Sequence, residues 1–262
     1  MAADWNPAQY RRFADERSRP FFDLLDLVQP MAAGRLADLG CGSGELTAAA
    51  AERFEPSSAL GIDSSPAMLA SAAAHGTDSL SFELGDILNW TAPAEFDIVI
   101  ANASLQWVPD HVAVLTRWTS ALRPGGQIAV QVPANGDMPS HVVAREVAQF
   151  EQFAKAFGSA GPPTDPVEQN VLTPEAYAAV LYQLGYVEQH VRLQVYPHVL
   201  ASSRAVVDWV RGTMLTRFQK VLDEATFAVF VQTYERRLIE VIGDHEPHFF
   251  PFKRILMWGR RP

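Results

Sequence analysis

A glycine-rich segment, Asp38 to Gly44, constrains the fold of this chain more than any other feature of its sequence. It lies at the end of a short apolar run at 35–39 and leads into an alanine-rich run at 45–54. These two runs predict a strand and a helix. Glycines at such a turn let the chain bend sharply and let a ligand contact the backbone beside a helix N-terminus. The spacing is GxGxG, because position 45 is glutamate, so the GxGxxG pattern of dinucleotide-binding sites is not met.

Short apolar runs alternate with helix-like runs over the first half of the chain. After the glycine-rich segment, strands are predicted at 59–62, 80–84, 96–100 and 127–132, and helices at 66–75 and 110–122. A tight turn is expected at 123–126, before the last of these strands. This order favours an α/β fold with a mostly parallel, doubly wound sheet. Two later strands, at 187–199 and 252–258, bring the expected number to about seven.

From about residue 135 the pattern becomes mainly helical, with helices predicted at 140–157, 174–184 and 203–242 and a Gly- and Pro-rich loop at 158–166. An apolar stripe within the last helix is interpreted as core or cap packing; its residues are Phe227, Phe230, Val231, Tyr234, Leu238 and Val241. We expect one domain over residues 1–262. Within it, residues 1–30 form an N-terminal lid, and about 135–185 and 200–245 form helical cap insertions around the substrate.

The charge balance argues against two classes of partner. Lys and Arg total 21 against 30 Asp and Glu, a net charge of −9, and the isoelectric point is near 5.2. Nucleic acid and anionic membrane are therefore disfavoured as partners. No apolar run has the length of a membrane span and the N-terminus lacks a secretory segment, so a cytoplasmic protein is expected. The single cysteine, Cys41, excludes an intrachain disulfide and a multi-cysteine zinc site, and no metal site is expected.

Polar residues end the next three predicted strands. Asp63 ends the second strand, 19 residues after Gly44, where a carboxylate can accept both ribose hydroxyls of an adenosine. Asp86 follows the third strand and is placed to receive an adenine amine, and Asn102 ends the fourth. Because the carboxyl ends of parallel strands converge on one crevice, these side chains are expected to line a single ligand site.

Residues 39–44, 61–68, 85–87 and 122–126 together resemble the class I S-adenosylmethionine-dependent methyltransferases. More narrowly, the chain resembles the trans-aconitate 2-methyltransferases almost end to end, most discriminatingly over the N-terminal segment and residues 101–111. The resemblance implies a Rossmann-like fold, with a seven-stranded, mostly parallel sheet, helices on both faces and an inserted helical cap. It also implies S-adenosyl-L-methionine as methyl donor and S-adenosyl-L-homocysteine as product.

The resemblance assigns the cofactor contacts to the glycine turn, the strand ends and the N-terminal lid. It places the ribose at Asp63, the adenine at Asp86 and Ile87, and the sulfonium beside Asn102 and Ala103. The full set of implied cofactor-binding residues is Tyr10, Arg17, Asp38, Gly40, Gly42, Asp63, Ser64, Met68, Asp86, Ile87, Asn102, Ala103 and Gln106.

The implied methyl acceptor is a carboxylate of a small polycarboxylic acid, with trans-aconitate the first candidate. A carboxyl group with a reference pKa of about 4 is already ionised at neutral pH, so no catalytic base is expected. The remaining carboxylates need cationic or polar partners, and the planar fork of arginine suits that task. The candidate substrate-binding residues are Arg19, Trp107, His141, Arg217 and Arg254.

Several alternatives stay open. Residues 133–135 and 212–218 depart from the family pattern, and both segments lie where the family recognises its substrate. Another small carboxylic acid or another small molecule is therefore the second candidate substrate. A NAD-dependent oxidoreductase fits the fold and Asp63 but lacks the third glycine of GxGxxG. A non-catalytic protein with a retained cofactor pocket is the third alternative. No feature of the sequence sets an oligomeric state.

Overall fold

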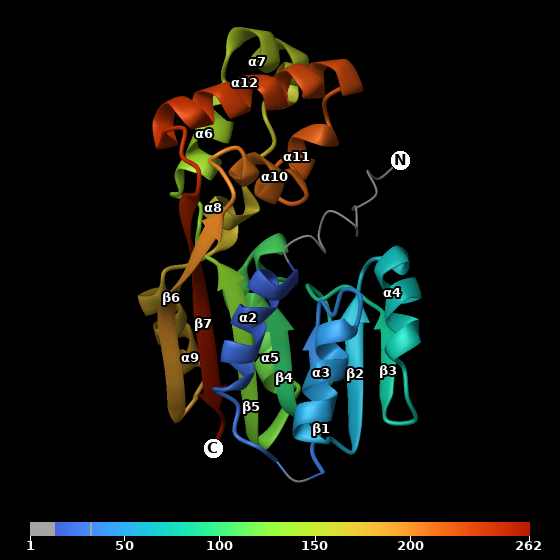
Figure 1. Cartoon of the computed structure of the whole chain (residues 1–262). Coiled ribbons are helices and arrows are strands. Elements are labelled where there is room, and N and C mark those ends of the chain that lie inside the picture. The colour runs from blue at the N-terminus through green and yellow to red at the C-terminus, as the bar shows by residue number, and fades with distance from the viewer. Residues whose placement is uncertain (1–13, 32) are drawn as a thin grey trace. The chain divides into compact units, whose positions relative to one another are not determined.

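The computed structural model describes residues 14–31 and 33–262, with side chains described from Ser18 onward. A seven-stranded sheet runs in the order β3-β2-β1-β4-β5-β7-β6 (Figure 1). Its strands are β1 Arg35–Leu39, β2 Ser58–Asp63, β3 Leu80–Leu84, β4 Phe96–Asn102, β5 Leu122–Pro133, β6 Glu188–Leu200 and β7 His248–Arg260. Strands β1 to β5 pair in parallel, and β7 pairs antiparallel with β5. The predicted mostly parallel α/β class is therefore confirmed.

The chain divides into two compact units. The sheet unit comprises residues 17–134, 170–194 and 254–262, and the described part of the helical unit includes residues 135–169 and 195–253. The sheet unit holds α2 Ala14–Leu25 from Arg17 onward, α3 Glu45–Phe54, α4 Pro66–Ala72, α5 His111–Ser120, α9 Pro174–Gln183 and the short helices η1 Ala73–His75 and η2 Leu105–Trp107. The helical unit holds α6 Pro139–Ala148, α7 Glu151–Phe157, η3 Gly158–Ala160, α8 Pro166–Asn170 up to Gln169, α10 Ala205–Arg211, α11 Thr216–Gln219 and α12 Glu224–Ile242.

Helices cover both faces of the sheet in the sheet unit. Successive strand residues point to opposite faces, and one face, which includes Val99 and Val130, packs with Trp118 of α5 and Tyr177 of α9 in a single buried cluster. Figure 1 shows α2 and α3 in front of the opposite face. Because β1 to β4 run parallel to one another, their carboxyl ends lie at one edge of the sheet, where Asp63, Asp86 and Asn102 lie.

Four segments differ from the sequence-based expectation. Residues 170–185, expected in the cap, belong with the sheet unit, because Tyr177, Val180 and Leu181 form an apolar helical face that packs in the sheet core. The turn expected at 123–126 lies within β5, where the pairing with β4 shifts register. The predicted helix at 203–242 is three helices, and that at 140–157 is two.

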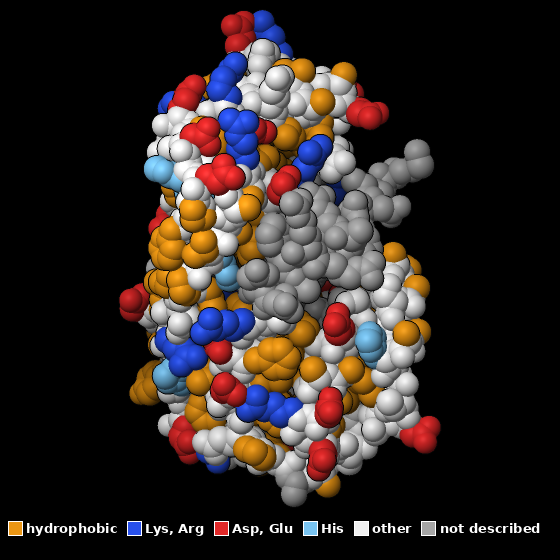
Figure 2. Space-filling view, viewed as in Figure 1, with side chains coloured by type: hydrophobic (Ala, Val, Ile, Leu, Met, Phe, Trp, Pro, Cys, Tyr) orange, Lys and Arg blue, Asp and Glu red, His pale blue; other side chains and the backbone are white. Residues whose placement is uncertain are grey.

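The helical unit has a core of its own. The apolar stripe of α12 packs there with Phe153, Phe218 and Trp209, as expected for cap packing. Val241, at the end of the stripe, is instead 47% exposed. No helix of the described residues combines the length and the apolar character that a membrane span requires. Figure 2 shows Lys and Arg interspersed with Asp and Glu on the visible face, which is the pattern of an ordinary solvated surface.

Candidate functional site

The glycine turn after β1 is fixed against β2 and β4. The N–H groups of Gly40 and Cys41 both donate to the carbonyl of Ile62, at 2.8 and 2.9 Å. Gly40 has φ +86°, and a Cβ there would stand 2.2 Å from Cβ of Ser104. Gly42 has φ +57°, and no atom of the described residues lies within 4 Å of its Cβ position. Gly40 is therefore required by packing, whereas Gly42 faces open space that a ligand can approach.

The carboxylate of Asp63 is held by the backbone on both sides. Its Oδ2 accepts the N–H of Gly42 at 2.9 Å and its Oδ1 accepts the N–H of Ser65 at 2.8 Å. An ionised carboxylate has about four acceptor positions, so about two remain for a diol such as a ribose. Ser64 is exposed and Met68 half-buried at the start of α4, beside this carboxylate in the chain.

The end of β3 presents a second carboxylate. Asp86 is exposed, and its Oδ1 accepts the N–H of Leu88 at 2.9 Å, which closes a turn and orients the side chain. Ile87 is buried, and its carbonyl accepts the indole N–H of Trp118 at 3.1 Å. The chain thus offers an exposed acceptor next to an apolar side chain, which suits an adenine amine and ring.

Unpaired amides gather where β4 ends. Ala103 has φ +53°, its N–H donates to the carbonyl of Gln131 at 2.9 Å, and its own carbonyl accepts Nε2 of Gln106 at 2.6 Å. Three side-chain atoms are buried there without a hydrogen-bond partner among the described residues: Oδ1 of Asn102, Oε1 of Gln106 and Nε2 of Gln131. A buried polar atom left unpaired costs about 1–3 kcal/mol, so these three atoms indicate a site built for a ligand or water.

Gln131 was not among the residues predicted from sequence. A signal for it exists, because it is a polar residue inside an otherwise apolar strand segment, 128–132. One predicted cofactor residue, Tyr10, lies outside the described residues, and only the backbone of another, Arg17 in α2, is described.

Two of the predicted substrate residues meet in the helical unit. Nδ1 of His141 lies 2.7 Å from Oδ2 of Asp165, and Nη1 of Arg217 lies 2.8 Å from the same oxygen. All three side chains are buried or nearly so. Despite its short distance, the Arg217 contact is an ion pair without hydrogen-bond alignment, and no described group forms a hydrogen bond with any of the three guanidinium nitrogens. The cluster therefore holds a buried cation whose donors remain available.

Asp165 is ionised within this cluster. Burial pushes the pKa of Asp165 up, but the hydrogen bond with His141 and the charges of His141 and Arg217 outweigh it and hold the pKa well below its ordinary range. The partly exposed Arg145 lies 3.9 Å from the same carboxylate and 3.1 Å from Glu168. The other predicted substrate residues belong to the sheet unit: Arg19 is exposed on α2, Trp107 is 58% exposed on η2, and Arg254 is half-buried on β7.

Comparison with known proteins identifies the family. The family described as "Methyltransferase domain" matches residues 32–176. The trans-aconitate 2-methyltransferase of Deinococcus radiodurans is 42% identical over 98% of both chains. That of Methylobacterium radiotolerans is 44% identical over 90% of this chain and 89% of its own. The chain belongs to the trans-aconitate 2-methyltransferase family.

Solved structures agree on the fold of this methyltransferase. The YcgJ protein of Bacillus subtilis matches 93% of the chain and 98% of its own length with a TM-score of 0.61 at 14% identity. An S-adenosylmethionine-dependent methyltransferase of Mesorhizobium loti matches 94% and 98% with a TM-score of 0.52 at 20% identity. At these identities the likeness concerns the fold, and it confirms the expected class I methyltransferase architecture.

Asp38 and Cys41 lie beneath the glycine turn of the methyltransferase. Asp38 is 3% exposed and accepts the hydroxyl of Thr47 at 2.6 Å. Burial raises its pKa to about 7, with the Thr47 bond acting against the rise and the charge of Asp63 adding to it. Burial and the same two carboxylates also raise the pKa of the Cys41 thiol. The thiol is therefore neutral at pH 7.

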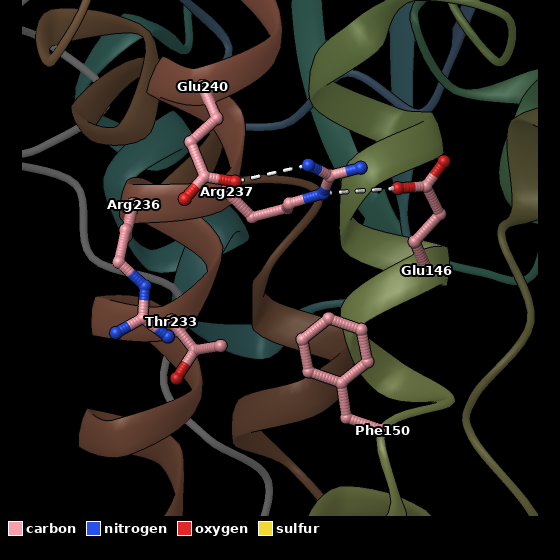
Figure 3. Close-up of a pocket in the computed structure, with 6 residues that line it drawn as sticks. All are labelled: Glu146, Phe150, Thr233, Arg236, Arg237 and Glu240. Atoms are coloured by element: carbon pink, nitrogen blue, oxygen red, sulfur yellow. Dashed lines mark hydrogen bonds and ion pairs between the residues drawn. The ribbon is translucent and has the colours of Figure 1, made fainter.

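A surface pocket of about 340 Å³ lies between α6 and α12 in the helical unit (Figure 3). Three of its four charged residues pair with one another, since Arg237 lies 3.7 Å from Glu146 and 3.1 Å from Glu240. None of the predicted site residues lines it. No described group of three or more His, Cys, Asp or Glu side chains is placed to hold a metal ion.

Gly40 and Gly42 are expected to respond differently to substitution by alanine. Gly40→Ala is expected to lower the free energy of unfolding by about 3 kcal/mol, because its Cβ overlaps Ser104 at a positive φ. Gly42→Ala meets no atom and is expected to cost about 1 kcal/mol from its backbone conformation. Its Cβ would instead obstruct the ligand. Urea unfolding and calorimetric titration of each variant separate these effects, and equal losses of stability would contradict the assignment.

Proposed function

We propose that this methyltransferase transfers the methyl group of S-adenosyl-L-methionine to a carboxylate of a small polycarboxylic acid, with trans-aconitate as first candidate. The observation that carries the proposal is the similarity, at 42% identity over nearly the whole chain, to a protein named for that reaction. We also place the reaction in the cytoplasm, without nucleic acid or membrane as partner. The net charge of −9 and the mixed surface charge support the exclusion of nucleic acid and anionic membrane as partners.

The residues at the sheet edge fit the cofactor. Open space above Gly42, acceptor positions left on Asp63 and the unpaired oxygens of Asn102 and Gln106 match the donors of an amino-acid and ribose moiety. When bound, S-adenosyl-L-methionine supplies an electrophilic methyl group on a sulfonium centre. The proposed contacts in the described part are Asp38, Gly40, Gly42, Asp63, Ser64, Met68, Asp86, Ile87, Asn102, Ala103 and Gln106, with Tyr10 and Arg17 added from the sequence.

The chain has to position the acceptor rather than activate it. A carboxylate is ionised at neutral pH and already carries the electron pair that forms the new bond, so no group of the protein must remove a proton. The contribution of the protein is therefore to orient the acid and to exclude water.

Arg217 is the best-supported receptor for a spectator carboxylate. It is largely buried, and its N–H groups lack aligned acceptors. Asp165 holds one end of the guanidinium, and His141 holds Asp165, so the fork is restrained before a ligand arrives. Trp107, Arg19 and Arg254 stay proposed substrate contacts, and His141 acts through Asp165.

A turnover assay tests the function. The enzyme is incubated with S-adenosyl-L-methionine and trans-aconitate, cis-aconitate, tricarballylate or succinate, and the methyl ester and S-adenosyl-L-homocysteine are quantified by mass spectrometry. We expect the highest kcat/KM for trans-aconitate. Preference for another acid removes trans-aconitate as the substrate, and absence of ester from every acid contradicts carboxyl methylation. A parallel calorimetric titration is expected to show binding of S-adenosyl-L-methionine and none of NAD.

A further inference from the structure

Three polar residues share one face of the sheet near the carboxyl end of β5. Asn102 of β4 lies opposite Gln131 of β5, and Arg254 of β7 lies opposite Pro133, two residues further along β5. Paired residues point to the same face and alternate residues repeat it, so Asn102, Gln131 and Arg254 point to the same side. Val130 and Val132 point to the other side and join the apolar core. The pleat thus places these three polar residues on one face of the sheet, near the strand ends that carry the proposed cofactor residues.

Gln131 is buried without using its side-chain donor. The residue is 1% exposed, and no described group accepts a hydrogen bond from its Nε2. Its main-chain carbonyl is already taken by the N–H of Ala103. A leucine of similar volume would avoid the cost of the unpaired amide, so packing alone does not explain a glutamine here.

Gln127 provides the comparison within the same strand. It lies on the same face, four residues earlier, and is also 1% exposed. Its Oε1 accepts the N–H of Gln29 at 2.8 Å and the indole N–H of Trp258 at 2.9 Å, and its Nε2 donates to the carbonyl of Gln29 at 2.7 Å. A glutamine that serves the fold is therefore fully bonded here, and Gln131 is not.

We propose that Gln131 determines specificity for the acceptor acid: its side-chain N–H donates a hydrogen bond to a carboxylate oxygen of the substrate. This inference rests on the proposed function. An amide donor orients a carboxylate without placing a full positive charge on it, so the oxygen that attacks keeps its electron density. The neighbouring Asn102 offers an unpaired acceptor, which cannot bond a carboxylate and is left for donors of the cofactor.

The test compares Gln131→Leu with Gln127→Leu. Trans-aconitate is titrated calorimetrically into each enzyme loaded with S-adenosyl-L-homocysteine, so that binding is read without turnover. Gln131→Leu is expected to keep or raise Tm, to keep the affinity for S-adenosyl-L-homocysteine within about twofold, and to bind the acid about 10- to 100-fold more weakly. Gln127→Leu is expected to lower Tm and to keep the affinity for the acid.

Gln131→Glu and Gln131→Asn sharpen the result. The glutamate retains the size but adds a negative charge, so we expect it to bind the acid more weakly than the leucine variant; the asparagine keeps the donor and should recover part of the affinity. Wild-type affinity in Gln131→Leu, or a fall in Tm like that of Gln127→Leu, would overturn the inference. If the wild-type enzyme forms no ester with any acid, the proposed function itself fails, which the turnover assay reveals separately.

Discussion

Asp63→Ala is expected to lower the affinity for S-adenosyl-L-methionine about 100-fold, because two hydrogen bonds to a charged acceptor are lost together. The same change releases the N–H groups of Gly42 and Ser65, which the carboxylate holds at 2.9 and 2.8 Å. The glycine turn then loses its anchor as well as its ribose acceptor. Calorimetric titration with S-adenosyl-L-methionine and S-adenosyl-L-homocysteine measures the effect.

Asp97→Ala is the matched control for this prediction. Asp97 also accepts a backbone N–H, that of Arg35 at 2.7 Å, and an N–H of Arg123 at 3.1 Å. It lies near the amino end of β4, at the opposite edge of the sheet from Asp63. We expect this variant to lose stability but to bind the cofactor within about twofold of wild type. Equal losses of affinity in the two variants would refute the assignment of the site to the carboxyl edge.

Asp165→Asn is expected to lower the free energy of unfolding of the helical unit by about 3–5 kcal/mol, because it leaves the cation of Arg217 buried without its counter-charge. Hydrogen exchange over residues 135–169 and 195–253, followed by mass spectrometry, localises the loss. Asp137→Ala removes an exposed pair with Lys253, at 2.6 Å, and is expected to cost less than about 1 kcal/mol. Similar losses in the two variants would show that Asp165 does not act as a buried counter-charge.

The contribution of Asp165 depends on pH in a definite direction. Its pKa in the folded chain lies below the ordinary value of 3.8, so the folded state binds fewer protons there than the unfolded state. The stabilisation is fully present above about pH 4 to 5 and is lost as the pH falls toward the lowered pKa. The difference in stability between wild type and Asp165→Asn should therefore narrow in acid, and a constant difference from pH 7 to pH 3 would contradict this account.

The strand-end features that we propose for cofactor binding are largely predictable from sequence because they are local. The glycine turn, Asp63, Asp86 and Asn102 each follow a short apolar run, and a parallel sheet brings the ends of such runs to one edge. The positive φ angles of Gly40 and Gly42 follow from the same turn. These features depend on neighbours within a few residues, which is the range over which periodicity and glycine placement are informative.

The remaining parts depend on long-range contacts. Asp165 lies in a segment that reads as a Pro-rich loop, and it becomes the centre of a buried cluster only because α6 and α11 bring His141 and Arg217 to it. Likewise, α9 shows an apolar face in the sequence, but that face does not specify whether it packs in a cap or on the sheet. Helical periodicity defines which side of a helix is buried, but it does not specify which element that side packs against.

The sequence alone was enough to predict the α/β class, the glycine turn and the acidic residues at the strand ends. Each of these features depends on residues that are close together in the chain. The tertiary structure alone distinguished Gln127 from Gln131, two glutamines on one face of one strand. Their difference is that Gln29 and Trp258 complete the hydrogen bonds of the first, while no described group completes those of Nε2 in the second. Whether a buried polar group is satisfied is a property of its three-dimensional surroundings, and there the fold separates a structural amide from one we assign to substrate.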